Sequence, residues 1–220
     1  MMRGLALGAL AVVVAGCGAE PSPTPSVACP TAAPTSVSAQ ATLADAAVAT
    51  VTVTGAVEGE FTINLHGEEA PIATANFVSL ARCGFYDGIK FHRVLDGFVV
   101  QAGDPETANH EGDFEGLGAG GPGYRFEIEP PAEGLAYDPY SVSMANAAPR
   151  IPDSNGSQFF IALADLDAGL PRNYTIFGQV GSGTEVIDEI AAVPVNDPRV
   201  GVPLTPVTIE SVVISATPEE

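Results

Sequence analysis

The fold of this chain is decided by the stretch Phe85–Asp104, which has the sequence FYDGIKFHRVLDGFVVQAGD. Lys90–Val94 and Phe98–Gln101 are short runs rich in β-branched and aromatic residues, which is typical of strands. Asp96 and Gly97 lie in the gap between these runs and indicate a turn. The stretch therefore predicts two adjacent strands.

Strand-like patterns also occur on both sides of this stretch. From Thr50 onward the sequence has a period of two, with Gly, Pro, Asp and Asn in the gaps. The further predicted strands are Thr50–Thr54, Glu60–His66, Tyr124–Glu129, Ser141–Asn146, Gln158–Leu163, Thr175–Val180 and Val207–Ser215. Helices are predicted from Ala70 to about Cys83 and from Gly183 to Ala192. Together these elements predict a mainly β protein, an antiparallel barrel whose ends are covered by two helices.

The N-terminus has the features of a secretory signal peptide. Arg3 precedes an apolar run, Leu5–Ala15, which is shorter than the roughly 20 residues that a membrane-spanning helix needs. The run leads into Val14-Ala15-Gly16-Cys17, which resembles the lipobox of bacterial lipoproteins. We therefore expect residues 1–16 to be a lipoprotein signal peptide and Cys17 to carry the lipid. An ordinary signal peptide with a cysteine near its end is the alternative.

Residues 17–49 are predicted to be a disordered tether between the lipid and the folded domain, residues 50–216. The segment is rich in Pro, Ala, Ser and Thr, and it buries too little apolar surface to offset its chain entropy. A short ordered arm after Val37 is the alternative. These features predict a protein outside the bacterial cytoplasm that is lipid-anchored to the cell membrane. Disulfides persist there, so Cys29 and Cys83 could be bridged, and the sequence leaves this open.

Composition and motifs exclude several function classes. With 27 acidic and 8 basic residues the formal net charge is −19, which repels nucleic acids and anionic lipid head groups. Gly118–Gly123 matches the G-x-G-x-x-G pattern, but a loop precedes it and a predicted strand follows, so a dinucleotide site is rejected. His110 lies in an acidic loop without ligand spacing to the other histidines, and no G-x-S-x-G motif occurs. We therefore expect neither a cofactor nor a metal.

Five sequence blocks follow one another at defined spacings along the folded part. They are Phe85–Val94, Gly97–Asp104, Ser143–Asn146, Asn155–Ile161 and Tyr174–Gly178. Together they resemble the cyclophilin family of peptidyl-prolyl cis/trans isomerases, over about residues 59–215. The resemblance implies a closed, eight-stranded antiparallel barrel capped by two α-helices. It also implies an enzyme that needs no cofactor and acts on proline-containing peptides and unfolded exported proteins. We expect a monomer, since a short acidic barrel gives no hint of an interface.

The residues in these blocks suit rotation about an X-Pro bond. The barrier is about 18–20 kcal/mol, and crossing it requires weakened amide resonance but no base, metal or nucleophile. A fixed hydrogen-bond donor aimed at the prolyl nitrogen would stabilise the twisted state. The resemblance implies that Arg93 is this donor and that Phe98 and Gln101 act with it. It implies substrate-binding roles for Val99, Ala145, Asn146, Gln158, Phe160, Leu170 and Tyr174.

Finer roles and departures follow from the same resemblance. Phe98, Val99, Phe160 and Leu170 would line a proline pocket, and Gln101, Asn146 and the Ala145 backbone would hold the substrate main chain. Gln158 would support Arg93 from behind, and His92 is assigned a structural role. Tyr174 stands where animal members of the family have histidine. The chain has no tryptophan, so weak cyclosporin binding is expected. The alternative function is a module that binds proline segments without turning them over.

Overall fold

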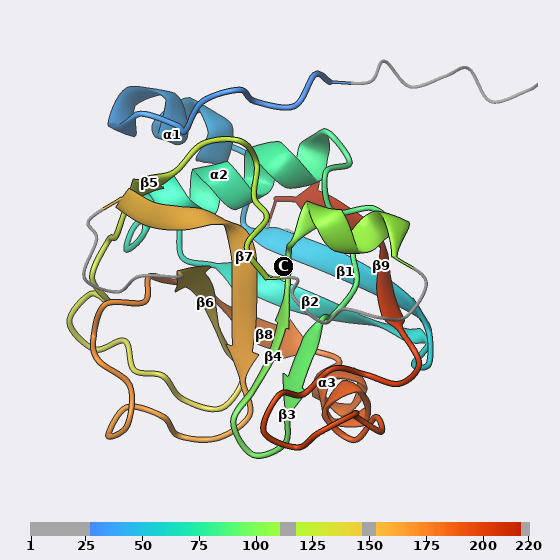
Figure 1. Ribbon diagram of the computed structural model, residues 1–220. Coiled ribbons are helices and arrows are strands. Elements are labelled where there is room, and N and C mark those ends of the chain that lie inside the picture. The colour runs from blue at the N-terminus through green and yellow to red at the C-terminus, as the bar shows by residue number, and fades with distance from the viewer. Residues whose placement is uncertain (1–26, 111–117, 147–152, 217–220) are drawn as a thin grey trace, which may run out of the picture.

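The computed structural model describes residues 27–110, 118–146 and 153–216 (Figure 1). The predicted signal peptide and Cys17 lie outside these ranges, as does most of the acidic loop after His110. Within the described ranges, no helix has both the length and the apolar character needed to cross a membrane.

All the strands of the described chain belong to one nine-stranded antiparallel sheet that curls around the core (Figure 1). The strands are β1 (Val48–Gly55), β2 (Gly59–Leu65), β3 (Arg93–Leu95), β4 (Val99–Ala102), β5 (Phe126–Glu127), β6 (Ser141–Asn146), β7 (Asp153–Ala162), β8 (Ile176–Ser182) and β9 (Val207–Ser215). Their order in the sheet is β3-β4-β7-β6-β8-β2-β1-β9, and β5 pairs with β7 off this path. The helices are α1 (Ser36–Leu43), α2 (Pro71–Arg82), α3 (Thr184–Ala191) and the 3₁₀ helix η1 (Pro105–Asn109). The mainly β class is confirmed.

The closed, eight-stranded barrel is not what the structure shows. The sheet path ends at β3 and β9, and no strand pairing joins these two in the described chain. The segment before β3 reaches β9 only through the bridge between Lys90 and Thr208 and the backbone hydrogen bonds around it, which join residues 88–91 to Val207 and Ile209 in the described chain. The bridge cannot lengthen because the chain changes partner there: the Phe91 N–H donates to Val207, whereas the His92 N–H donates to Gln101 of β4. The sheet is therefore a curled half-barrel.

Alternation along the strands separates a core face from an outer face. Val94, Val100, Ile161 and Val142 form one row across β3, β4, β7 and β6, and none of them exposes more than 2% of its surface. Inside the curl, Phe77 of α2 packs against the rings of Tyr86, Phe159 and Phe177. The residues that precede or follow the buried row, such as Arg93 and Gln101, point to the outer face.

Helix α2 confirms the helix predicted from Ala70 to Cys83, but its N-terminus is capped by a distant residue. Ala70 has no side chain that could cap the helix. Glu129 does this instead, because its carboxylate accepts from the Ile72 N–H at 3.0 Å and from the Ala73 N–H at 2.8 Å. Burial raises the pKa of Glu129, and these two bonds oppose the rise. The second predicted helix is confirmed as α3.

Helix α1 lies inside the segment that was expected to be a disordered tether. The extended tether is therefore wrong for this part of residues 17–49, and the ordered-arm alternative applies. Thr35 and Ser38 form a capping box, with the Ser38 N–H donating to Thr35 Oγ1 and the Thr35 N–H donating to Ser38 Oγ. Arg82 of α2 holds the other end, donating to the Thr42 carbonyl at 3.0 Å and to Asp45 at 2.6 Å.

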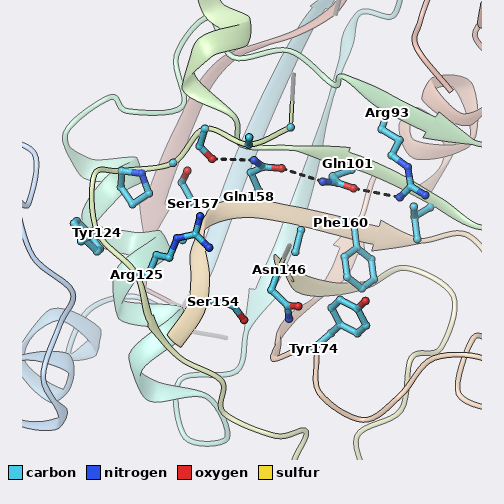
Figure 2. Close-up of a pocket in the computed structure, with 18 of the residues that line it drawn as sticks. Arg93, Gln101, Tyr124, Arg125, Asn146, Ser154, Ser157, Gln158, Phe160 and Tyr174 are labelled. Atoms are coloured by element: carbon cyan, nitrogen blue, oxygen red, sulfur yellow. Dashed lines mark hydrogen bonds between the residues drawn. The ribbon is translucent and has the colours of Figure 1, made fainter. Parts of the chain in front are cut away.

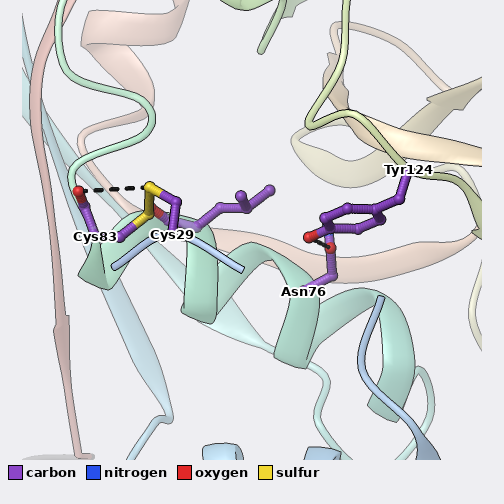
Figure 3. The surroundings of a disulfide bond; sticks show 5 residues. Cys29, Asn76, Cys83 and Tyr124 are labelled. Carbon is purple, nitrogen blue, oxygen red and sulfur yellow. Dashed lines mark hydrogen bonds between the residues drawn. A yellow bond between two sulfur atoms is a disulfide. The ribbon is translucent and has the colours of Figure 1, made fainter. Parts of the chain in front are cut away.

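A disulfide joins Cys29 to Cys83, so the possibility that the sequence left open is confirmed (Figure 3). The two Cα atoms are 5.1 Å apart, within the usual range for a disulfide. Cys83 is the C-cap residue of α2, and Cys29 lies 54 residues earlier in the chain. The bridge therefore fastens the N-terminal segment to the end of a core helix.

Replacing Glu129 by Ala should lower the free energy of unfolding by about 1–2 kcal/mol, because two backbone N–H groups at the start of α2 lose their acceptor. Urea unfolding followed by circular dichroism measures this. The matched control is Glu127→Ala, which removes an exposed carboxylate from the same segment and should change stability much less. Equal effects of the two substitutions would show that the cap contributes nothing.

Replacing both Cys29 and Cys83 by Ser should lower the free energy of unfolding by about 2–4 kcal/mol, since the bridge restricts a long loop of the unfolded chain. Guanidinium unfolding of the oxidised protein, the reduced protein and the double variant compares the three states. The reduced protein should match the double variant. An unchanged midpoint on reduction would contradict the expectation.

Candidate active site

A cavity of about 470 Å³ opens on the outer face of β3, β4, β7 and β6 (Figure 2). All ten site residues predicted from the sequence line it. They are Arg93, Phe98, Val99, Gln101, Ala145, Asn146, Gln158, Phe160, Leu170 and Tyr174. The structure therefore gathers these residues around one space, while the individual roles assigned to them stay predictions.

Strand register brings three of these residues into one row. Arg93 of β3 pairs with Gln101 of β4, and Gln101 pairs with Phe160 of β7. Directly paired residues of antiparallel strands point to the same face, with Cβ atoms about 4.5–5.5 Å apart. A guanidinium, an amide and an aromatic ring thus stand side by side.

A chain of hydrogen bonds crosses the floor of the cavity (Figure 2). Arg93 Nη1 donates to Gln101 Oε1 at 3.3 Å, and Gln101 Nε2 donates to Gln158 Oε1 at 3.0 Å. Gln158 Nε2 in turn donates to the Gly120 carbonyl oxygen at 2.9 Å. Gln158 is therefore linked to Arg93 through the side chain of Gln101, and the supporting role expected for Gln158 stays a prediction.

The other end of the cavity is apolar. The rings of Phe160 and Tyr174 meet edge to face with centroids 5.6 Å apart, and Figure 2 shows them together below Arg93. Arg93 Cζ lies 5.8 Å from the Phe98 centroid, within range of a cation–π contact. Burial lowers the pKa of Arg93, which a favourable interaction with Tyr174 partly opposes. Among the described residues the guanidinium has one hydrogen bond, to Gln101, so its other N–H donors remain available to a substrate.

Asn146 offers an acceptor beside this apolar end. Its Nδ2 donates to the Asn173 carbonyl oxygen at 3.1 Å, which fixes the orientation of the amide. Its Oδ1 is buried and has no partner among the described residues. A peptide N–H of a bound substrate would satisfy this oxygen.

The sequence missed a second group of lining residues, of which Figure 2 shows Tyr124, Arg125 and Ser157 on the side of the cavity away from Tyr174. The group consists of Gly118, Ala119, Gly120, Gly121, Pro122, Gly123, Tyr124, Arg125, Ser154, Gly156 and Ser157. The rejection of a dinucleotide site at Gly118–Gly123 agrees with the strand β5 that follows this run. The density of glycines was nevertheless a signal, because such a backbone can pass close to other groups.

His92 is buried beneath this loop, next to Arg93. It exposes 5% of its surface, does not line the cavity, and has no hydrogen-bond partner for either ring nitrogen among the described residues. Burial lowers the pKa of His92, and the carboxylate of Asp104 opposes part of this effect. The ring is therefore neutral at pH 7, consistent with the structural role that the sequence suggested.

The described lining of the cavity suits the binding of a peptide. Among the lining residues in the described ranges there is no carboxylate, histidine or cysteine. The site combines an apolar recess with a guanidinium and several amides, which match an apolar ring and peptide groups. These features define a class of mainly β proteins with a cleft suited to peptides.

The chain belongs to the cyclophilin family. The family model described as cyclophilin type peptidyl-prolyl cis-trans isomerase/CLD matches residues 48–214. The peptidyl-prolyl cis-trans isomerase B of Streptomyces anulatus is 42% identical over 173 residues, covering 71% of this chain and 91% of that protein. The peptidyl-prolyl cis-trans isomerase A of Mycobacterium tuberculosis is 41% identical over 177 residues, covering 71% and 87%.

Solved structures agree with this assignment. A cyclophilin type peptidyl-prolyl cis-trans isomerase of Cryptosporidium parvum superimposes with a TM-score of 0.66 and 29% identity, covering 79% of this chain and 99% of that chain. A second structure of that protein, obtained in the presence of the dipeptide Ala-Pro, has a TM-score of 0.65 and 30% identity, with 77% and 99% covered.

Replacing His92 by Phe should flatten the loss of stability on acidification. Burial lowers the pKa of His92 in the folded protein, so acid protonates this residue first in the unfolded chain. The stability that this difference provides is complete above the unfolded-state pKa of about 6.5. It is lost as the pH falls below that value, by at most about 1.4 kcal/mol per pH unit. Unfolding free energies at pH 7.5, 6.5 and 5.5 measure this. The variant and the wild type should diverge only below pH 6.5, and parallel pH curves would contradict the prediction.

Proposed function

We propose that this protein catalyses the reversible cis/trans isomerisation of X-Pro peptide bonds. The observation that carries the proposal is the position of Arg93, held by Gln101 and the Phe98 ring at the edge of an apolar recess. Membership of the cyclophilin family, in which the relatives named above are peptidyl-prolyl isomerases, supports the same activity.

The residues around the cavity suit each requirement of the reaction. Rotation demands that the prolyl nitrogen become pyramidal, with its lone pair localised, and a donor aimed at that nitrogen then binds the twisted state best. Arg93 would be this donor, while Phe98, Val99, Phe160 and Leu170 would receive the proline ring. Gln101, Asn146 and the Ala145 backbone would hold the neighbouring peptide groups. No proton leaves or enters the substrate in this mechanism.

We further propose that the enzyme works outside the cytoplasm, attached to the membrane by a lipid on Cys17 after residues 1–16 are removed. Its substrates would be exported proteins that are still unfolded, and it would act as a monomer. The lipobox-like sequence supports the anchor. The Cys29–Cys83 disulfide is consistent with an oxidising compartment.

A binding module that captures proline-containing segments without turning them over is the second candidate. The available donors of Arg93 argue against it, because simple capture of a proline ring needs only the apolar recess. Turnover and binding therefore have to be measured on the same variants.

Replacing Arg93 by Ala should lower kcat about 100- to 1,000-fold, because the donor to the prolyl nitrogen is lost. Peptide binding should weaken but remain measurable, since the apolar recess is unchanged. Both measurements use a chain that begins at Gly18 and so keeps Cys29. The rate of isomerisation is measured with a proline peptide that a protease cleaves only in the trans form. Calorimetry measures the binding of the peptide.

The matched control is Arg199→Ala, which removes an exposed arginine that pairs with Asp197 outside the cavity. It should retain full turnover. A folded wild type that binds the peptide without accelerating its isomerisation would favour the binding module. Unchanged turnover in Arg93→Ala would show that the site is assigned wrongly.

A further inference from the structure

Asp104 is a buried carboxylate that the mechanism above does not use. It exposes none of its surface, and no lysine or arginine pairs with it in the described chain. Its two oxygens accept hydrogen bonds from different parts of the chain. Oδ1 accepts from the Glu106 N–H at 2.9 Å and caps η1, whereas Oδ2 accepts from the Gly118 N–H at 2.6 Å and the Gly120 N–H at 3.2 Å.

The backbone of this loop is fitted to the carboxylate. A Cβ atom at Gly120 would collide with Asp104 Oδ1, so only glycine lets the backbone approach so closely. Gly118 has a φ of 105°, a conformation that side chains with a Cβ rarely adopt. Charge-assisted bonds to two N–H groups therefore fix the position of the loop from behind the cavity.

The Gly120 carbonyl group fixes the orientation of the two glutamine amides that lead to the Arg93 guanidinium. The Gly120 carbonyl oxygen can only accept, so Gln158 must turn its Nε2 toward it and its Oε1 toward Gln101. Gln101 must then present Nε2 to Gln158 and Oε1 to Arg93, which can only donate. An acceptor at one end and a donor at the other thus leave both amides with a single satisfactory orientation.

We propose that Asp104 is a positioning residue for the isomerase reaction, acting through Gly120, Gln158 and Gln101 on the orientation of Arg93. The proposal rests on the proposed function, because it assigns Arg93 the central role there. If the hydrogen bonds from the loop to Asp104 were lost, the Gly120 carbonyl group would move. The side-chain amide of Gln158 could then rotate and exchange the positions of its oxygen and its NH₂ group. Gln101 could then present its NH₂ group to the guanidinium, which would repel it from its place beside Phe98.

Asp104→Asn tests this, since the amide keeps one acceptor oxygen but sets an NH₂ group against backbone donors. We expect kcat to fall about 10- to 100-fold, as for a misplaced catalytic group, with KM changing much less. Gly120→Ala should have the same effect, because it displaces the loop while leaving the carboxylate in place. The control is Thr107→Val, which disturbs η1 through the bond from Thr107 Oγ1 to the Asp104 carbonyl and should lower stability but not kcat.

A double-mutant cycle with Gln158→Leu separates positioning from a general loss of stability. If Asp104 acts through Gln158, the Asp104→Asn/Gln158→Leu variant should be no slower than the slower single variant. Additive losses, or wild-type kcat in both Asp104→Asn and Gly120→Ala, would overturn the proposal.

Nuclear magnetic resonance gives a readout that does not depend on activity. The side-chain NH₂ resonances of Gln101 and Gln158 should shift and broaden in Asp104→Asn and Gly120→Ala but not in Thr107→Val. Unchanged resonances in the first two variants would also overturn the proposal. If the wild type itself lacked turnover, the proposed function would fail, and these resonances would still report whether Asp104 orients the amides.

Discussion

The register between β3, β4 and β7 is the constraint on which the site depends. It pairs Arg93 with Gln101 and Gln101 with Phe160, so the guanidinium, the amide and the ring share one face of the sheet. The same register places Val94, Val100 and Ile161 in the next row on the opposite face, where all three are buried. A slip by one residue would turn the apolar row outward and Arg93 inward. Burial of the core and alignment of the site are therefore enforced by one interaction.

The register does not by itself orient the side chains. Arg93 and Gln101 have long, flexible side chains, and paired backbones leave their polar ends free. Their orientation depends on the hydrogen bonds that run to Gln158 and Gly120, which lie on β7 and on the glycine-rich loop. The strand pairing thus sets the approximate position of the Arg93 and Gln101 side chains, and the loop sets the orientation of their polar ends. This division explains why a segment that is neither helix nor strand lines much of the cavity.

The sequence predicted the parts of this protein that depend on local pattern. Alternation located the strands, and the family blocks identified all ten residues that meet in the cavity. Local pattern could not reveal Glu129, because it caps α2 from more than fifty residues away. Helix α1 was missed because its hydrophobic pattern is weak and its ends are fixed by a capping box and by Arg82 of another helix. The half-open sheet was missed because the change of partner at His92 is a backbone event without a side-chain signature.

The disulfide gives the proposed anchor a definite geometry. No residue of the described segment before β1 lines the cavity, so the proposed membrane attachment through that segment would leave the site open to substrate. Because Cys29 is fastened to α2, only the chain between Cys17 and Cys29 can separate the folded body from the lipid. Fully extended, those 12 steps span at most about 40 Å. An enzyme held in this way would sample only substrates that pass close to the membrane surface.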